Sequence, residues 1–173
     1  MNRINEKAQE LQANLEDLLV REFRACQGLS AYTKEERAAL TSNNVEKLSE
    51  LVDKKEALLD EIGMVEESRR SVVESLAREI GQAGKCSTLT ELLPHLESAI
   101  AGRLSRLREG ILALSSEVRD LTSGNVALTN SALEHNDALQ SFLLAICQPP
   151  PIYQSTGTAA SLAPTPWNLN CGA

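Results

Sequence analysis

The sequence predicts an all-α protein: an elongated antiparallel three-helix coiled-coil bundle followed by a flexible C-terminal tail. Three observations lead to this fold class. Apolar residues recur in steps of four and three through residues 1–147, which is the 3.5-residue repeat of left-handed coiled coils. The composition is 42% hydrophobic but only 3% aromatic, as in proteins built from long helices. Five of the six prolines lie in 149–166, whereas all 24 acidic and 17 basic residues precede residue 148.

The first helix is expected over about residues 2–40. Its apolar seam contains one charged residue, Glu22, and consists of Ile4, Ala8, Leu11, Leu15, Leu18, Glu22, Ala25, Leu29 and Tyr32. The second helix is expected over about 44–81, because residues 41–44 offer several N-cap side chains and Gly81 offers a C-cap. Its apolar stripe is less regular than the first, since two cations occupy seam positions: Lys55 and Arg69.

A short turn of helix is expected over 88–93, because Thr88 and Glu91 have the spacing of a capping box. The third long helix is expected over 95–147, with Pro94 suited to its first turn. These lengths and short connections favour an antiparallel bundle over residues 1–147. We expect its core to include four residues of the third seam: Leu107, Ile111, Leu114 and Val118.

The third helix is longer than the other two, and its seam stays apolar to its end. Five seam or near-seam residues are therefore candidates for a binding surface: Leu128, Leu139, Phe142, Leu143 and Ile146. A homodimer contact, or an offset of the first two helices that covers these residues, explains the pattern equally well. His135 on this seam is interpreted as a packing residue or a partner contact. Asn125 either fixes the register of the helices or contacts a partner.

The charge and the motifs exclude several functions. A net charge of −7 and a pI near 4.9 argue against nucleic-acid binding. No apolar run is long enough for membrane insertion. The scattered cysteines favour a reducing, cytoplasmic location. The segment 81–87 departs from a phosphate loop, because Cys86 stands where Ser or Thr would bind the metal. We expect no catalytic residues, no metal, no cofactor and no enzyme activity.

Four short patterns, taken in order along the chain, resemble the FlgN-like family of flagellar export chaperones. The segment 55–59 is similar to the family's Lys-x-x-Leu-Leu step, and 67–70 is similar to its Arg-Arg pair. Arg119-Asp120-Leu121, with the later Asn125, Leu128 and Asn136, resembles its Asn-containing segment. Pro150-Pro151-Ile152-Tyr153 followed by Gly157 resembles its tail motif. The 88–93 turn and the uncharged chain end, with Trp167 and Cys171, depart from the family pattern.

The resemblance implies a cytosolic chaperone that holds hook-filament junction proteins, of the FlgK and FlgL types, for type III export. It implies that the chaperone grips an amphipathic terminal segment of its client. The client-binding residues would be Asn125, Leu128, His135, Leu139, Phe142, Leu143 and Ile146. It also implies that Ile152, Tyr153 and Gly157 in the predicted tail, 148–173, dock to the export gate. In the other interpretation that the sequence leaves open, Tyr153 folds back onto the end of the third helix and shields Phe142. The alternative is a structural or oligomerising coiled-coil adaptor without an export client.

Overall fold

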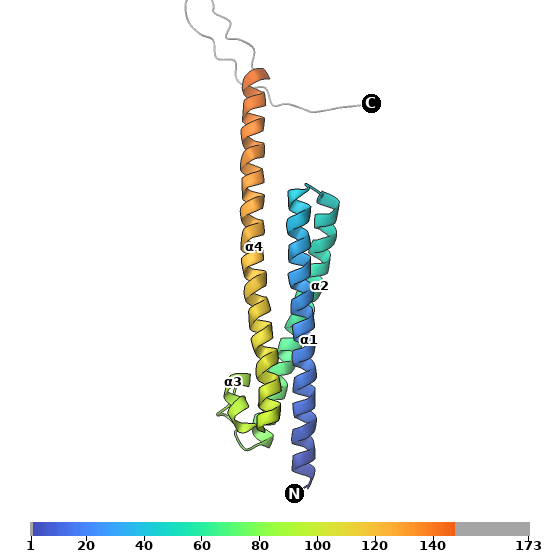
Figure 1. Ribbon diagram of the computed structural model, residues 1–173, viewed down its shortest axis with the longest axis vertical. Coiled ribbons are helices and arrows are strands. Elements are labelled where there is room, and N and C mark those ends of the chain that lie inside the picture. Colours follow the sequence, from blue (N-terminus) through green and yellow to red (C-terminus); the bar gives the residue numbers. More distant parts are fainter. Residues whose placement is uncertain (1, 148–173) are drawn as a thin grey trace, which may run out of the picture. The chain divides into compact units, whose positions relative to one another are not determined.

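The computed structural model describes residues 2–147, and their secondary structure consists of helices (Figure 1). The chain forms α1 (Asn2–Thr41), α2 (Val45–Glu79), α3 (Leu89–Leu92), the 3-10 helix η1 (Leu93–His95) and α4 (Ser98–Cys147). It divides into two compact units, of which the first ends at Asn130 and the second begins at Ser131. The predicted tail lies outside the described residues. The all-α prediction is confirmed, whereas the left-handed coiled-coil packing stays a prediction.

Helices α1 and α2 pack side by side as an antiparallel hairpin (Figure 1). The Asn44 side chain caps α2 by accepting a 3.0 Å hydrogen bond from the backbone N–H of Lys47. Ion pairs then follow the two helices in opposite directions. They join Lys7 to Glu79, Arg21 to Glu61, Glu22 to Arg69, and Glu36 to Lys55. From Lys7 to Glu36 along α1, the partner in α2 moves back from Glu79 to Lys55, which defines the antiparallel alignment.

The part of α4 in the first unit runs parallel to α1 and therefore antiparallel to α2. Its contacts with α1 advance together along both helices. Arg103 pairs with Glu16 at 2.9 Å, and the Ser30 hydroxyl donates to Glu117 at 2.9 Å. Further along, the Asn125 side-chain amide donates to the Thr33 carbonyl at 3.0 Å. The direction of the chain thus reverses between α2 and α4, as the sequence predicts.

The short α3 helix lies where α2 ends and α4 begins (Figure 1). The predicted capping box is confirmed, because Thr88 accepts from the backbone of Glu91, whose carboxylate accepts from the backbone of Thr88 at 3.1 Å. A second bond from the backbone of Ser87, at 2.8 Å, helps to lower the pKa of Glu91. The cap orients α3 so that two of its side chains are buried: Leu89 and Leu92.

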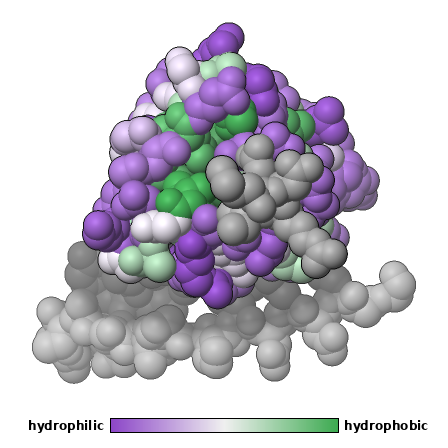
Figure 2. All heavy atoms as spheres, turned by 90° about the horizontal axis from the view of Figure 1, so that it is seen from below, coloured by the Kyte–Doolittle hydropathy of each residue, from purple (hydrophilic) through white to green (hydrophobic). Residues whose placement is uncertain are grey.

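The hydrophobic core lies at this end of the first unit, where all four α-helices contribute. When the molecule of Figure 1 is viewed from its lower end, apolar side chains occupy a confined area surrounded by hydrophilic ones (Figure 2). The buried cluster consists of Leu15, Leu19, Cys26, Val73, Leu76, Ala77, Cys86, Leu89, Leu92, Leu104 and Ile111. Helix α3 therefore closes the end of the hairpin with leucines, which a bundle of three helices alone would leave open.

The predicted seam of α1 is buried from Leu15 to Leu29, but the buried face is wider than the seam. It also includes Leu19, Cys26, Ser30 and Thr33. The extra width follows from the contacts, because α1 packs against α2 on one side and α4 on another. A helix between two neighbours needs a broader apolar stripe than a two-stranded seam provides.

Some predictions for α2 and α4 need correction. Of the four expected core residues in α4, only Ile111 is fully buried, whereas Leu107, Leu114 and Val118 are half-buried. The apolar stripe expected for α2 included Leu51, Val52 and Leu59, of which Leu51 is buried whereas Val52 and Leu59 are exposed. Helix α4 begins at Ser98 rather than at residue 95, because Leu96 is extended (φ −98°, ψ 162°) and separates it from η1.

Cations at seam positions of α2 meet carboxylates of α1. The Glu22 side chain is buried and accepts a 3.1 Å hydrogen bond from Arg69 Nε. Burial raises the pKa of Glu22 above the ordinary carboxyl value, and the attraction of Arg69 offsets part of that effect. Lys55 pairs in the same way with Glu36 at 2.9 Å. The irregular seam of α2 is therefore complementary to charges on α1.

Replacing Leu104 by Ala should lower the free energy of unfolding by about 2–5 kcal/mol, because Leu104 is fully buried and the substitution leaves a cavity. Leu112→Ala on the same helix is the matched control, since Leu112 is exposed, and we expect a change within about 0.5 kcal/mol. Urea unfolding followed by circular dichroism measures both. Equal losses in the two variants would contradict the described register of α4.

Candidate functional site

The last turns of α4 carry the largest group of exposed apolar side chains in the described chain. All described side chains of residues 131–147 are exposed, and this segment belongs to the second unit. Four of the predicted client contacts are 48–62% exposed and follow one side of the helix at three- and four-residue steps. We call them the α4 terminal stripe: Leu139, Phe142, Leu143 and Ile146.

The surroundings of the α4 terminal stripe are almost free of charge. No Asp, Glu, Lys or Arg occurs from Ala138 to Cys147, and the preceding turns carry only the acidic Glu134 and Asp137. Two further apolar side chains, Leu133 and Leu144, are exposed on another side of the helix. Sequence reasoning missed them because they lie off the four-three step. Residues eleven positions apart lie on the same side of a helix, so this spacing could have identified the pair.

The remaining candidate residues occupy different environments. His135 is exposed, within the same helical segment as the α4 terminal stripe. Leu128 is half-buried and Asn125 is 4% exposed, and both belong to the first unit. Burial of Asn125 supports its interpretation as a residue that fixes register. The three predicted gate-docking residues lie outside the described chain: Ile152, Tyr153 and Gly157.

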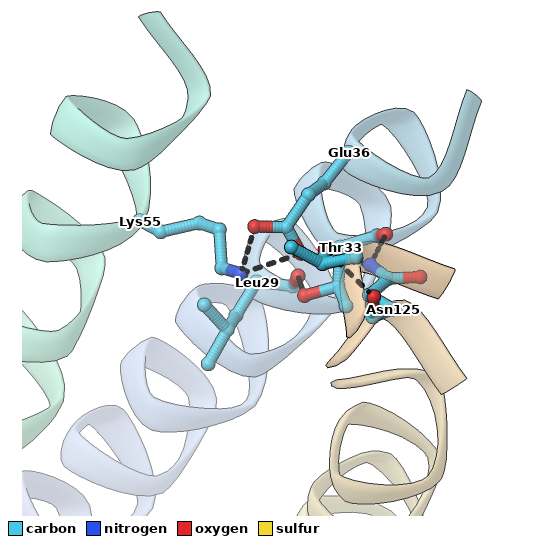
Figure 3. Close-up of polar contacts among 6 residues, drawn as sticks. Leu29, Thr33, Glu36, Lys55 and Asn125 are labelled. Atoms are coloured by element: carbon cyan, nitrogen blue, oxygen red, sulfur yellow. Dashed lines mark hydrogen bonds and ion pairs between the residues drawn. The ribbon is translucent and has the colours of Figure 1, made fainter. Parts of the chain in front are cut away.

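Asn125 joins a polar cluster that links α1, α2 and α4 (Figure 3). Its amide donates to the Thr33 carbonyl at 3.0 Å and to the Glu36 carboxylate at 2.7 Å. Lys55 of α2 donates to both oxygens of the same carboxylate, at 2.9 and 3.0 Å. Asn125 Oδ1 accepts no hydrogen bond from the described residues. These hydrogen bonds form only when the helices are correctly aligned, and one buried oxygen of the cluster stays without a donor among the described residues. The cluster therefore serves to align the helices more than to increase stability.

The described residues offer little for chemistry. No group of three or more His, Cys, Asp or Glu among them could hold a metal ion. Burial raises the pKa of the Cys26 thiol, which disfavours the reactive thiolate. A depression between Arg69 and Arg108 has a volume of about 180 Å³, below the usual 300–1,000 Å³ of small-molecule sites. Within residues 2–147, no helix is both long and apolar enough to span a membrane.

A family model described as "FlgN protein" matches residues 1–161, which includes the whole described helical region and the positions of Ile152, Tyr153 and Gly157. No curated protein and no solved structure shows significant similarity to the chain.

Replacing Asn125 by Ala should lower the free energy of unfolding by about 1–3 kcal/mol, because the Glu36 carboxylate and the Thr33 carbonyl lose a buried donor. Asn125→Asp should lower the free energy of unfolding further at neutral pH, since it places a second carboxylate beside Glu36, and by less as the pH falls into the carboxyl range. Urea titrations at pH 7 and pH 4 measure both effects. Asn136→Ala, an exposed position on the same helix, is the control. If Asn125→Ala lowers the free energy of unfolding no more than the control does, Asn125 does not align the helices.

Proposed function

The chain belongs to the FlgN family of flagellar export chaperones, and on that basis we propose that it holds hook-filament junction proteins of the FlgK and FlgL types. In this proposal the chaperone binds an amphipathic terminal segment of the junction protein in the cytoplasm and delivers it to the export gate. The observation that carries the proposal is the exposed α4 terminal stripe. An apolar helix face without a covering partner is the surface on which an amphipathic helix docks.

The spacing of the α4 terminal stripe supports a helical client. Leu139, Phe142, Leu143 and Ile146 repeat at three- and four-residue steps, so a second helix with the same repeat would pack along them. Each of these side chains can contribute about 1.5–3 kcal/mol when fully buried. Glu134 and Asp137 at the start of the segment would favour a client helix with a basic residue at one end.

The family's tail motif supports the second half of the proposal. Ile152, Tyr153 and Gly157 lie in the part of the chain that the family model matches. A tyrosine combines a large apolar contact with one hydroxyl group, at a modest cost in conformational entropy. We assign this tyrosine to the export gate rather than to the client.

The same apolar stripe also supports a second candidate, an oligomerising adaptor that has no export client. Size-exclusion chromatography with light scattering separates the two functions. A chaperone forms a defined one-to-one complex with a junction-protein terminal fragment. An adaptor associates with further copies of itself through the α4 terminal stripe and does not bind the fragment.

Phe142→Ala combined with Ile146→Ala should weaken client binding roughly a hundred-fold or more, because two apolar contacts are lost from the interface. The melting temperature should change little, since neither side chain packs into the core of the described residues. Calorimetric titration with a FlgK-type terminal fragment measures the affinity. Val52→Ala combined with Leu112→Ala provides the control, because these side chains are similarly exposed in the first unit. Unchanged client affinity in the Phe142 and Ile146 variant would rule out the stripe as the client site.

Tyr153→Ala should preserve client binding and bundle stability but lose binding to the export gate. The reason is that the tyrosine follows Pro149-Pro150-Pro151, beyond the end of the helix that carries the client site. Pull-downs of client fragment and gate domain with the same variant give the comparison. Tyr153→Phe tests whether the hydroxyl or the ring is needed. Retention of the gate domain by Tyr153→Ala would show that this tyrosine has no gate role.

A further inference from the structure

The α4 terminal stripe has no cover within the described chain, although it is apolar and uncharged. Exposed apolar patches of this kind normally mark a surface that another segment occupies. The stripe ends at Ile146, and α4 ends one residue later at Cys147. The residues that follow directly are therefore the nearest candidates to cover it.

The 26 residues from Gln148 to Ala173 have a composition that suits this surface. They contain no Asp, Glu, Lys or Arg, in a chain with 24 acidic and 17 basic residues. Contact with the equally uncharged 138–147 would therefore require no charge to be desolvated. The segment carries apolar and aromatic side chains at intervals: Ile152, Tyr153, Leu162, Trp167 and Leu169.

The length and the prolines of the segment permit a return path along α4. Pro149-Pro150-Pro151 lack the backbone N–H groups that a helix needs, so we expect the chain to leave the helix axis directly after the stripe. An extended chain covers about 3.3 Å per residue, whereas a helix rises 1.5 Å per residue. The segment can thus span the few turns of the stripe several times over. Its tether keeps its effective concentration near the millimolar range, so weak contacts suffice for occupancy.

We propose that residues 148–173 occupy the α4 terminal stripe of their own chain when no client is bound, and that they compete with the client for it. The competition rests on the proposed function, whereas the occupancy does not. If the segment covers the stripe in nine of ten molecules, the apparent dissociation constant for the client rises roughly ten-fold. Because Tyr153 belongs to the same segment, client binding would also release the residue assigned to the gate.

Trp167 is the only tryptophan in the chain and reports directly on the occupancy. In the client-free full-length protein its emission should be blue-shifted, and its quenching by acrylamide weaker, relative to a free peptide of residues 148–173. Phe142→Ala with Ile146→Ala should move both readings toward the peptide, whereas Val52→Ala with Leu112→Ala should not. Emission equal to that of the free peptide would overturn the proposal. So would a blue shift that disappears on dilution, since the occupant would then be a second copy.

The competition has its own test in the full-length chain. Leu162→Ser with Leu169→Ser should shift Trp167 toward the peptide value and strengthen client binding several-fold, while sparing Ile152 and Tyr153. Ala159→Ser with Ala160→Ser is the matched control within the segment. Addition of a tryptophan-free client fragment to the parent protein should release Trp167. If Trp167 is docked in the parent protein but the Leu162 and Leu169 variant binds the client with unchanged affinity, the proposed competition is wrong. A chain that never binds the fragment, yet keeps its tryptophan covered, would instead contradict the proposed function.

Discussion

The alignment of the helices in the first unit depends on polar groups placed within otherwise apolar seams. Leucine-rich seams with a 3.5-residue repeat bury similar area when one helix slides by seven residues, so apolar contacts alone leave the register weakly defined. Glu22 removes that freedom, because a shifted α2 would bury its carboxylate without Arg69. A buried charge without its partner costs several kcal/mol. The cluster of Asn125, Glu36 and Lys55 imposes the same restriction on all three long helices.

This alignment explains the distribution of burial along α1 and α4. Helix α1 lies against both other long helices and has the broadest buried face, including the uncharged polar Ser30 and Thr33. The hydroxyl of Thr33 donates to the Leu29 carbonyl of its own helix, and the Thr33 carbonyl accepts separately from the Asn125 amide. Beyond Asn130, α4 continues with every described side chain exposed. The molecule therefore combines a core fixed by specific polar contacts with a helical segment whose apolar side chains are unpaired.

Such a division fits the function proposed above, in which the partner is released after delivery. Contacts to an apolar stripe are additive and largely non-directional, so they tolerate sequence differences between clients better than buried hydrogen bonds do. Because no charged side chain occurs from Ala138 to Cys147, an apolar segment could bind there without desolvating a charge. A competing segment from the same chain would lower client affinity without altering the contacts themselves. Substitutions in the competing segment could then change the client affinity while the contacts between the stripe and the client stay the same.

The sequence by itself determined the helices, their approximate bounds and the family, because hydrophobic periodicity, cap residues and prolines act locally. It also shows that residues 148–173 differ from the rest of the chain in composition, because they contain no Asp, Glu, Lys or Arg. Only the tertiary structure decided which seam residues are buried. Val52 and Leu59 continue the apolar pattern of α2 yet are exposed, and Leu114 is half-covered, since burial depends on which neighbour lies opposite. Asn125 carried two equal interpretations until Thr33, Glu36 and Lys55 were found around it, because a periodic pattern reveals a polar seam position but not its partners.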